Sequence, residues 1–146
     1  MALKDILVLV DNDENGPARL ETALALAQAY QAHLVGLLVL PRIRIPTYVE
    51  APLPANIVEA QGNAQKERAA EIERTFRQAA EKAEVSHEWR CTEGERDEVA
   101  AVHARYCDVV VVGQRYPDAL GSDIPDRMIL SIGRPWWCPT SAPIPR

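Results

Sequence analysis

Two apolar runs separated by an amphipathic segment constrain the fold of this chain most strongly. Residues 6–10 and residues 34–40 are apolar throughout, and strands of that kind are buried on both faces, as in parallel sheets covered by helices. Between them, residues 17–30 begin with a proline, which is tolerated at the first helical position, and carry Leu20 and Leu24 at helical spacing. This order of strand, helix and strand predicts a right-handed crossover and two parallel strands.

The remainder of the chain continues this alternation. Its prolines predict one long surface loop over residues 41–54. Hydrophobic patterns then predict a helix at 59–83, a strand at 85–91, a helix at 95–106, a strand at 108–113, a helix at 125–132 and a last strand at 134–140. The first two of these helices are expected to bury Ala60, Ala64, Ile72, Phe76, Ala79 and Ala83, and then Val99, Val102 and Tyr106. The whole pattern predicts a three-layer α/β sandwich on a parallel five-strand sheet.

Composition fits one ordinary domain and excludes several classes of function. A chain of 146 residues, 47% of them hydrophobic, can bury an adequate core without disulfides or metals. The net charge of −5 and the lack of any Lys/Arg run argue against nucleic-acid or anionic-membrane surfaces, which need clustered positive charge. No apolar run approaches the ~20 residues of a membrane span, and three widely spaced cysteines fit reduced thiols. We therefore expect a cytoplasmic protein.

The position of a binding site follows from the fold class. In open parallel sheets the crevice lies at the carboxyl ends of the strands, so residues 11–16, the loop after Leu40 and the segment after Gly113 are expected to surround it. Asp11 and Asp13 follow the first strand directly. They could hold Mg²⁺ as a pair of acids, or they could cap the turn before the next helix.

Other candidate chemistries carry weaker signals. His103 and Cys107 are four residues apart on one predicted helix, but zinc sites need three or four ligands, and a half-buried helix face explains both residues. Walker A, G-x-G-x-x-G and G-x-S-x-G motifs are absent. No cysteine stands in a recognisable nucleophile context.

Four segments, taken in order, form a pattern that covers nearly the whole chain. They are Ile6-Leu-Val-Leu-Val-Asp11, the helix 17–30 leading to His33-Leu-Val-Gly36-Leu-Leu-Val39, the segment Cys107-Asp108-Val-Val-Val-Val-Gly113-Gln-Arg115, and Gly133-Arg-Pro135. This pattern resembles the universal stress protein family. The resemblance implies a flavodoxin-like fold with strand order 3-2-1-4-5, and a cytoplasmic regulator or adaptor of the stress response that is not an enzyme. An ATP-binding member or a nucleotide hydrolase of the same fold is the alternative.

The resemblance also implies where a nucleotide would bind. ATP-binding members carry Gly-x-x-Gly, nine residues and then Gly-Ser or Gly-Thr, because glycine amides and a helix N-terminus must approach phosphate oxygens closely. This chain keeps Gly113, but Tyr116 replaces the second glycine and Asp126-Arg127 replace the final pair. Gly121 and Ser122 offer either a shifted phosphate site among acidic neighbours or a simple helix cap.

Two further positions match the family beside the nucleotide, Asp11 and Val39. The candidate nucleotide-binding residues are thus Asp11, Val39, Gly113, Gly121 and Ser122. Loss of the other glycines favours absent or weak ATP binding and no resident cofactor. If a ligand binds, the resemblance implies ATP or AMP with Mg²⁺.

The end of the chain departs from the family pattern. We expect residues 1–140 to form the domain and residues 141–146 an irregular tail. The last strand should be short or frayed, because Trp136 and Trp137 are bulky and the prolines that follow cannot pair in a ladder. The resemblance implies that this edge joins two copies in a homodimer, with a regulatory protein as a further partner.

A shifted reading frame would restore the expected ending. The sequence Trp136-Trp137-Cys138-Pro139 can be encoded as TGG TGG TGC CCN, and the frame that starts one base earlier reads GTG GTG GTG CCC, which is Val-Val-Val-Pro. We expect that one G was lost near Pro135, in the gene or in the recorded sequence, and that the intended protein continues, into a second similar domain. A divergent aromatic tail is the alternative, and sequencing the downstream DNA decides between them.

Overall fold

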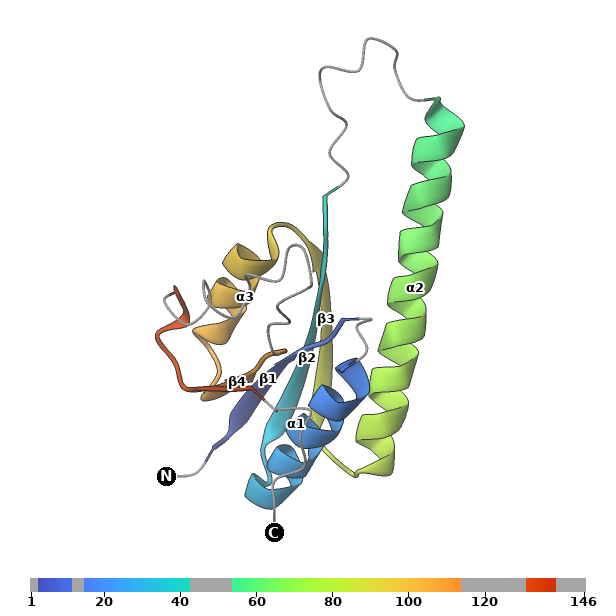
Figure 1. Cartoon of the computed structure of the whole chain (residues 1–146). Coiled ribbons are helices and arrows are strands. Elements are labelled where there is room, and N and C mark those ends of the chain that lie inside the picture. The colour runs from blue at the N-terminus through green and yellow to red at the C-terminus, as the bar shows by residue number, and fades with distance from the viewer. Residues whose placement is uncertain (1–2, 12–14, 43–53, 114–130, 139–146) are drawn as a thin grey trace.

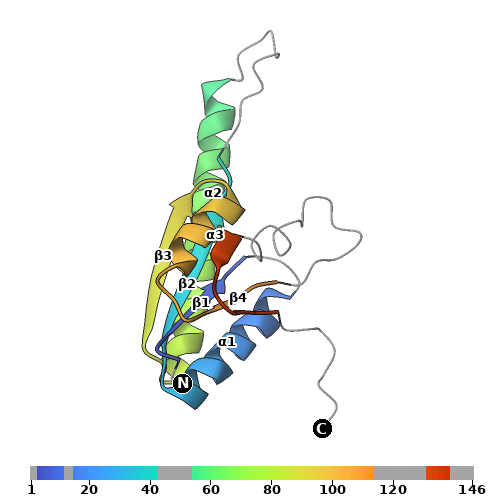
Figure 2. The ribbon, with the colours of Figure 1, turned by 90° about the vertical axis from the view of Figure 1, so that its left-hand side faces the viewer.

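A parallel sheet in the order β3-β2-β1-β4-β5 forms the middle layer of the computed structural model (Figure 1). The structure describes residues 3–11, 15–42, 54–113 and 131–138. The strands are β1 (Asp5–Leu9), β2 (His33–Leu40), β3 (His87–Glu93), β4 (Val109–Val111) and β5 (Trp136–Trp137), and the helices are α1 (Gly16–Tyr30), α2 (Ala55–Lys82) and α3 (Arg96–Ala104). Helices α1 and α2 cover one face and α3 the other (Figure 2). The predicted three-layer fold and its strand order are confirmed.

Most element bounds lie within a few residues of the prediction, and one difference has a clear cause. Strand β3 begins at His87 rather than at Val85. The Val85 amide instead donates to the carbonyl of Ala80, 3.0 Å away, and the side chain is buried at the end of α2. The predicted loop over 41–54 and helix over 125–132 lie mostly outside the described residues, although residues 131–132 are helical.

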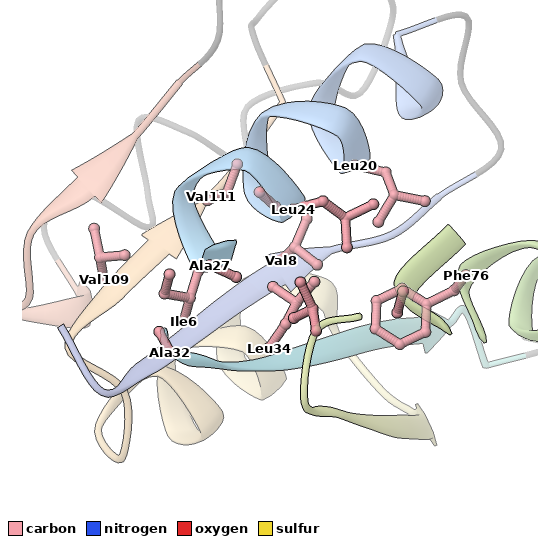
Figure 3. Close-up of a cluster of buried hydrophobic side chains, with 13 residues drawn as sticks. Ile6, Val8, Leu20, Leu24, Ala27, Ala32, Leu34, Phe76, Val109 and Val111 are labelled. Atoms are coloured by element: carbon pink, nitrogen blue, oxygen red, sulfur yellow. The ribbon is translucent and has the colours of Figure 1, made fainter. Parts of the chain in front are cut away.

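Each central strand contributes to two separate hydrophobic cores. Ile6 and Val8 of β1 point toward α1 and α2, where they pack with Leu20 and Leu24 of α1 (Figure 3). The alternate residues of the same strand pack against α3 in the second core. Because successive side chains of a strand point to opposite faces, a run that is apolar at every position supplies both cores at once.

The largest side chain of the first core lies directly on the sheet. Phe76 of α2 is fully buried, and a Cβ added to Gly36 of β2 would come within 2.7 Å of its ring. Glycine at position 36 therefore leaves room for the ring. The centroid of the ring also lies 5.3 Å from that of Trp89, the residue of β3 that pairs with Gly36.

Helix α3 faces the sheet with a different side from the one expected. Ala100, Ala101 and Ala104 are buried, whereas Val102 is 53% exposed and Tyr106 78%. The expectation that these two residues point inward is therefore wrong. Three alanines at positions i, i+1 and i+4 share one helix face, and their small side chains let the helix approach the strands.

Helix α2 extends well beyond the sheet at its N-terminal end (Figure 1). Its 28 residues span roughly 42 Å, whereas the eight residues of β2 span about 26 Å. Ala60 and Ala64 lie on this overhang and are exposed, so that part of the predicted buried stripe is wrong, while Phe76 and Ala80 are buried. No helix in the described part of the chain is both long and apolar enough to cross a membrane.

The last strand is short, as predicted. Backbone bonds to β4 flank its two ladder pairs, from the Val110 amide to the Pro135 carbonyl (3.1 Å) and from the Val112 amide to the Trp137 carbonyl (3.0 Å). Trp136 and Trp137 remain 42% and 48% exposed. Since they pair with neighbouring residues of β4 that belong to different cores, their indoles lie on opposite faces of the sheet.

Candidate functional site

The candidate site lies at the carboxyl ends of β1, β2 and β4. Asp11 follows β1, Val39 is near the end of β2, and Gly113 follows β4. The side chain of Val39 is buried in the core beneath α3. Gly121 and Ser122, the other two candidate residues, lie outside the described residues, as do Tyr116, Asp126, Arg127 and Asp13.

An arginine that the sequence analysis did not single out connects two of these positions. Arg19 lies in the first turn of α1, and its side chain is only 2% exposed. Its Nη1 donates to the Leu9 carbonyl oxygen at 2.9 Å and to Oδ1 of Asp11. The guanidinium therefore turns back from α1 onto the end of β1.

The same guanidinium lies against the backbone of Gly113. A Cβ added to this glycine would be 2.5 Å from Nη2 and 2.9 Å from Cζ of Arg19. Glycine is thus required here for the arginine to lie where it does. The space beside Gly113, which the sequence analysis assigned to a phosphate, holds a side chain of the protein itself.

The second oxygen of Asp11 belongs to another ion pair. Arg96, the first residue of α3, places Nη1 3.0 Å from Oδ2 of Asp11. The side chain of Asp11 is 18% exposed and that of Arg96 is 37% exposed. We refer to Asp11, Arg19 and Arg96 as the Arg–Asp–Arg bridge. It carries two positive charges and one negative charge. The turn after Asp11, including Asp13, lies outside the described residues, so the predicted turn cap and the predicted pair of acids stay predictions.

The sequence contains a pattern that indicates the burial of Arg19. The buried face of α1 consists of Arg19, Leu20, Ala23, Leu24 and Ala27, so helical spacing alone places a charged residue in an apolar stripe. A buried guanidinium needs a counter-charge, and Asp11 is the acid that precedes the helix at the end of β1. Arg96 gave no comparable signal, because a partly exposed arginine at a helix start is common.

A groove between α1 and α2 begins beside Asp11. The groove has a volume of about 790 Å³. Its apolar lining includes Leu20, Leu24 and Phe76, and Asp11 stands at one end. At the far end Nε2 of Gln28 donates to the Ala83 carbonyl at 2.7 Å and joins the two helices.

A second polar cluster joins α3 to the edge strand β3. Nη1 of Arg90 lies 3.2 Å from Nδ1 of His103, and Nε of Arg90 donates to Glu88 at 2.6 Å. Burial, and then the nearby Arg90, hold the pKa of His103 below its usual value. Nδ1 must accept this hydrogen bond, so the contact favours the neutral imidazole.

The three cysteines lie in surroundings that favour the protonated thiol. Sγ of Cys107 donates to the His103 carbonyl at 3.8 Å, so the spacing of these two residues reflects a helix end. Burial raises the pKa of Cys107 to about 11 and also raises the pKa of Cys91 and of Cys138. No group of three potential metal ligands occurs among the residues that the structure describes.

Comparisons with known proteins agree with this architecture. The model of the universal stress protein family matches residues 2–122. The chain belongs to this family. Membership places it among stress-response proteins, as the family name implies. Among curated proteins, none matches the sequence significantly.

Solved structures of family members share the fold. Universal stress protein UspA from Lactobacillus plantarum has a TM-score of 0.73 and 18% identity, over 94% of this chain and 98% of its own. A member of the family from Burkholderia pseudomallei has a TM-score of 0.69 and 22% identity, over 93% and 95%. A family protein from Arabidopsis thaliana, solved with AMP bound, has a TM-score of 0.67 and 15% identity, over 92% and 90%. At these identities the similarity establishes the fold.

Proposed function

We propose that this chain is a non-enzymatic regulator or adaptor of the stress response, that it acts in the cytoplasm, and that it binds ATP weakly or not at all. The observation that carries the proposal is the position of Arg19. Its guanidinium fills the space beside Cα of Gly113, the one motif glycine that the sequence keeps. A triphosphate that entered this space would have to displace a buried arginine and break its ion pair with Asp11.

The state of the cysteines supports a role without catalysis. The thiolate is the nucleophile in cysteine chemistry, and burial raises the pKa of Cys107, Cys91 and Cys138. All three thiols are therefore protonated near neutral pH.

Nucleotide binding is the second candidate, and one observation favours it. Asp11 and Val39 stand at the carboxyl ends of neighbouring strands, where open α/β sheets bind ligands. The Arabidopsis relative was solved with AMP. An adenosine group could use these positions without a phosphate beside Gly113.

Thermal unfolding with and without millimolar Mg-ATP tests the proposal. A ligand present at ~100 times its Kd adds about 2.7 kcal/mol to the free energy of unfolding. We expect almost no change in Tm, and no adenine nucleotide in mass spectra of the purified, denatured protein. A clear rise in Tm that Gly121→Asp abolishes would instead support the second candidate.

We also propose that two copies pair through the edge at β5. The outer edge of this strand is unpaired among the described residues, and Trp136 and Trp137 give it exposed apolar surface. Light scattering at rising concentration should show a dimer, and Trp136→Lys should weaken it more than Ile57→Lys on the overhang of α2. A wild-type monomer at high concentration would contradict the pairing.

A further inference from the structure

The Arg–Asp–Arg bridge brings two cations from different elements to a single carboxylate. Arg19 comes from α1 and Arg96 from α3, and each contacts a different oxygen of Asp11. Two guanidiniums that share one carboxylate can also share another oxyanion, because the planar N–H fork fits carboxylate and phosphate alike. Removal of the carboxylate would leave the buried Arg19 without this counter-charge.

We propose that Arg19 and Arg96 form a receptor for one phosphate-type oxyanion, either inorganic phosphate or the single phosphate of a monoester, and that the Asp11 carboxylate occupies this receptor as a built-in competitor. The receptor lies at the carboxyl ends of β1 and β4, where sheets of this class bind ligands. It opens to solvent on the side of Arg96, the more exposed of the two arginines. Arg19 forms its inner wall against Gly113.

The charges around the bridge favour one oxyanion over a triphosphate. The two guanidiniums balance at most two negative charges, and Asp11 remains beside the ligand after it is displaced. Each additional phosphate would add negative charge beside Asp11, whereas the bridge itself supplies two cations. This proposal rests on the proposed function in one respect: both use the bridge, which in the proposed function opposes the binding of ATP.

The variant Asp11→Asn tests whether the Asp11 carboxylate competes with an oxyanion for the two arginines. Asp108→Asn is the matched control. The Asp108 carboxylate also joins distant segments, because Oδ2 accepts the amides of Lys4 (2.7 Å) and Asp5 (3.1 Å), but it lies at the opposite end of the sheet. Thermal unfolding is measured at pH 7.5 in sodium chloride, sodium phosphate and sodium sulfate at matched ionic strength. In chloride, Asp11→Asn should unfold below the wild type.

Phosphate and sulfate should then raise the Tm of Asp11→Asn by at least ~4 °C relative to chloride. The same salts should raise the wild type less, since its carboxylate competes, and should change Asp108→Asn no more than the wild type. Adding Arg96→Gln to Asp11→Asn should remove most of the rise. Equal salt effects in Asp11→Asn and Asp108→Asn would overturn the proposal.

Two further measurements keep the test decisive. If Asp11→Asn does not fold in chloride, Arg96→Gln alone is compared with the wild type, and a phosphate response that it leaves intact overturns the receptor. Calorimetry of Asp11→Asn with phosphate, AMP and adenosine separates the sources. Tighter binding of AMP than of phosphate indicates a monoester, equal binding indicates a free oxyanion, and equal binding of AMP and adenosine overturns the proposal. A wild-type response to Mg-ATP would contradict the proposed function instead.

Discussion

Large side chains fill the α1–α2 face of the sheet, whereas the α3 face is covered by a helix that contributes alanines. On the first face Phe76, Leu20 and Leu24 occupy the space above the strands. On the second face α3 lies close to the strands, and Arg96 and His103 tie it to β1 and β3 through polar contacts. The packing of α1 and α2 on the sheet thus depends on the volume of their side chains. The packing of α3 depends on its close approach to the strands and on its polar contacts.

Truncation of Phe76 should produce the largest loss. Phe76→Ala empties a fully buried site, and changes of this kind typically cost about 3–5 kcal/mol. Urea denaturation of the variant measures the loss, with Tyr30→Ala, at an exposed aromatic residue of α1, as the control. A loss below ~1 kcal/mol would mean that volume on this face matters less than its packing suggests.

Enlarging an alanine of α3 should come second. Ala104→Leu inserts a side chain where the helix meets the strands, and overpacking of this kind typically costs about 1–3 kcal/mol. Val102→Leu adds volume on the exposed side of the same helix and serves as the control in the same denaturation assay. A neutral Ala104→Leu would show that α3 has room beneath it.

Acidification should weaken the α3 face by a smaller amount. The pKa of His103 is lowered by burial first and by Arg90 second, while Glu88 raises it. The unfolded chain therefore binds this proton more readily, so the contribution is complete above pH ~6.5 and is lost as the pH falls toward the folded pKa. Between pH 7.5 and 5.5 the Tm of the wild type should fall more than that of His103→Gln. Parallel pH curves would argue against this contact.

Changes on the outer side of α3 and in the turn that follows it should have the smallest effect. Val102→Ala and Tyr106→Ala alter exposed residues, and such substitutions usually stay within about 0.5 kcal/mol of the wild type. Urea denaturation of both variants checks the orientation of the helix. A loss above ~1 kcal/mol at either position would place that residue inside an interface.

These two faces also show what the sequence could predict. Apolar runs at residues 6–10 and 34–40 leave no polar side, so their burial on both faces follows from the sequence alone. In the segment of α3 and the turn after it, by contrast, hydrophobicity predicts that Val99, Val102 and Tyr106 are buried. The residues that α3 buries against the sheet are instead its small alanines. Whether a helix lies close enough to need alanine depends on the strands beneath it, which the helix sequence does not contain.

Some residues of the candidate site could likewise be predicted from the sequence, and others could not. Asp11 and Gly113 were placed correctly at strand ends, because an α/β alternation fixes where strands finish. Their shared neighbour Arg19 was missed, since an arginine is usually a surface residue and only the helical spacing placed it inward. The ion pair with Arg96 joins residues 85 positions apart in the chain, and no local pattern encodes such a partner.

The two tryptophans of strand β5 give the protein an intrinsic fluorescence signal at this edge of the sheet. The chain contains three tryptophans, and two of them, Trp136 and Trp137, lie partly exposed on this edge, while Trp89 packs against Phe76 beneath α2. Indole emission shifts with the polarity around the ring. The intrinsic fluorescence of the folded chain should therefore report mainly on whatever covers or uncovers this edge, without an attached label.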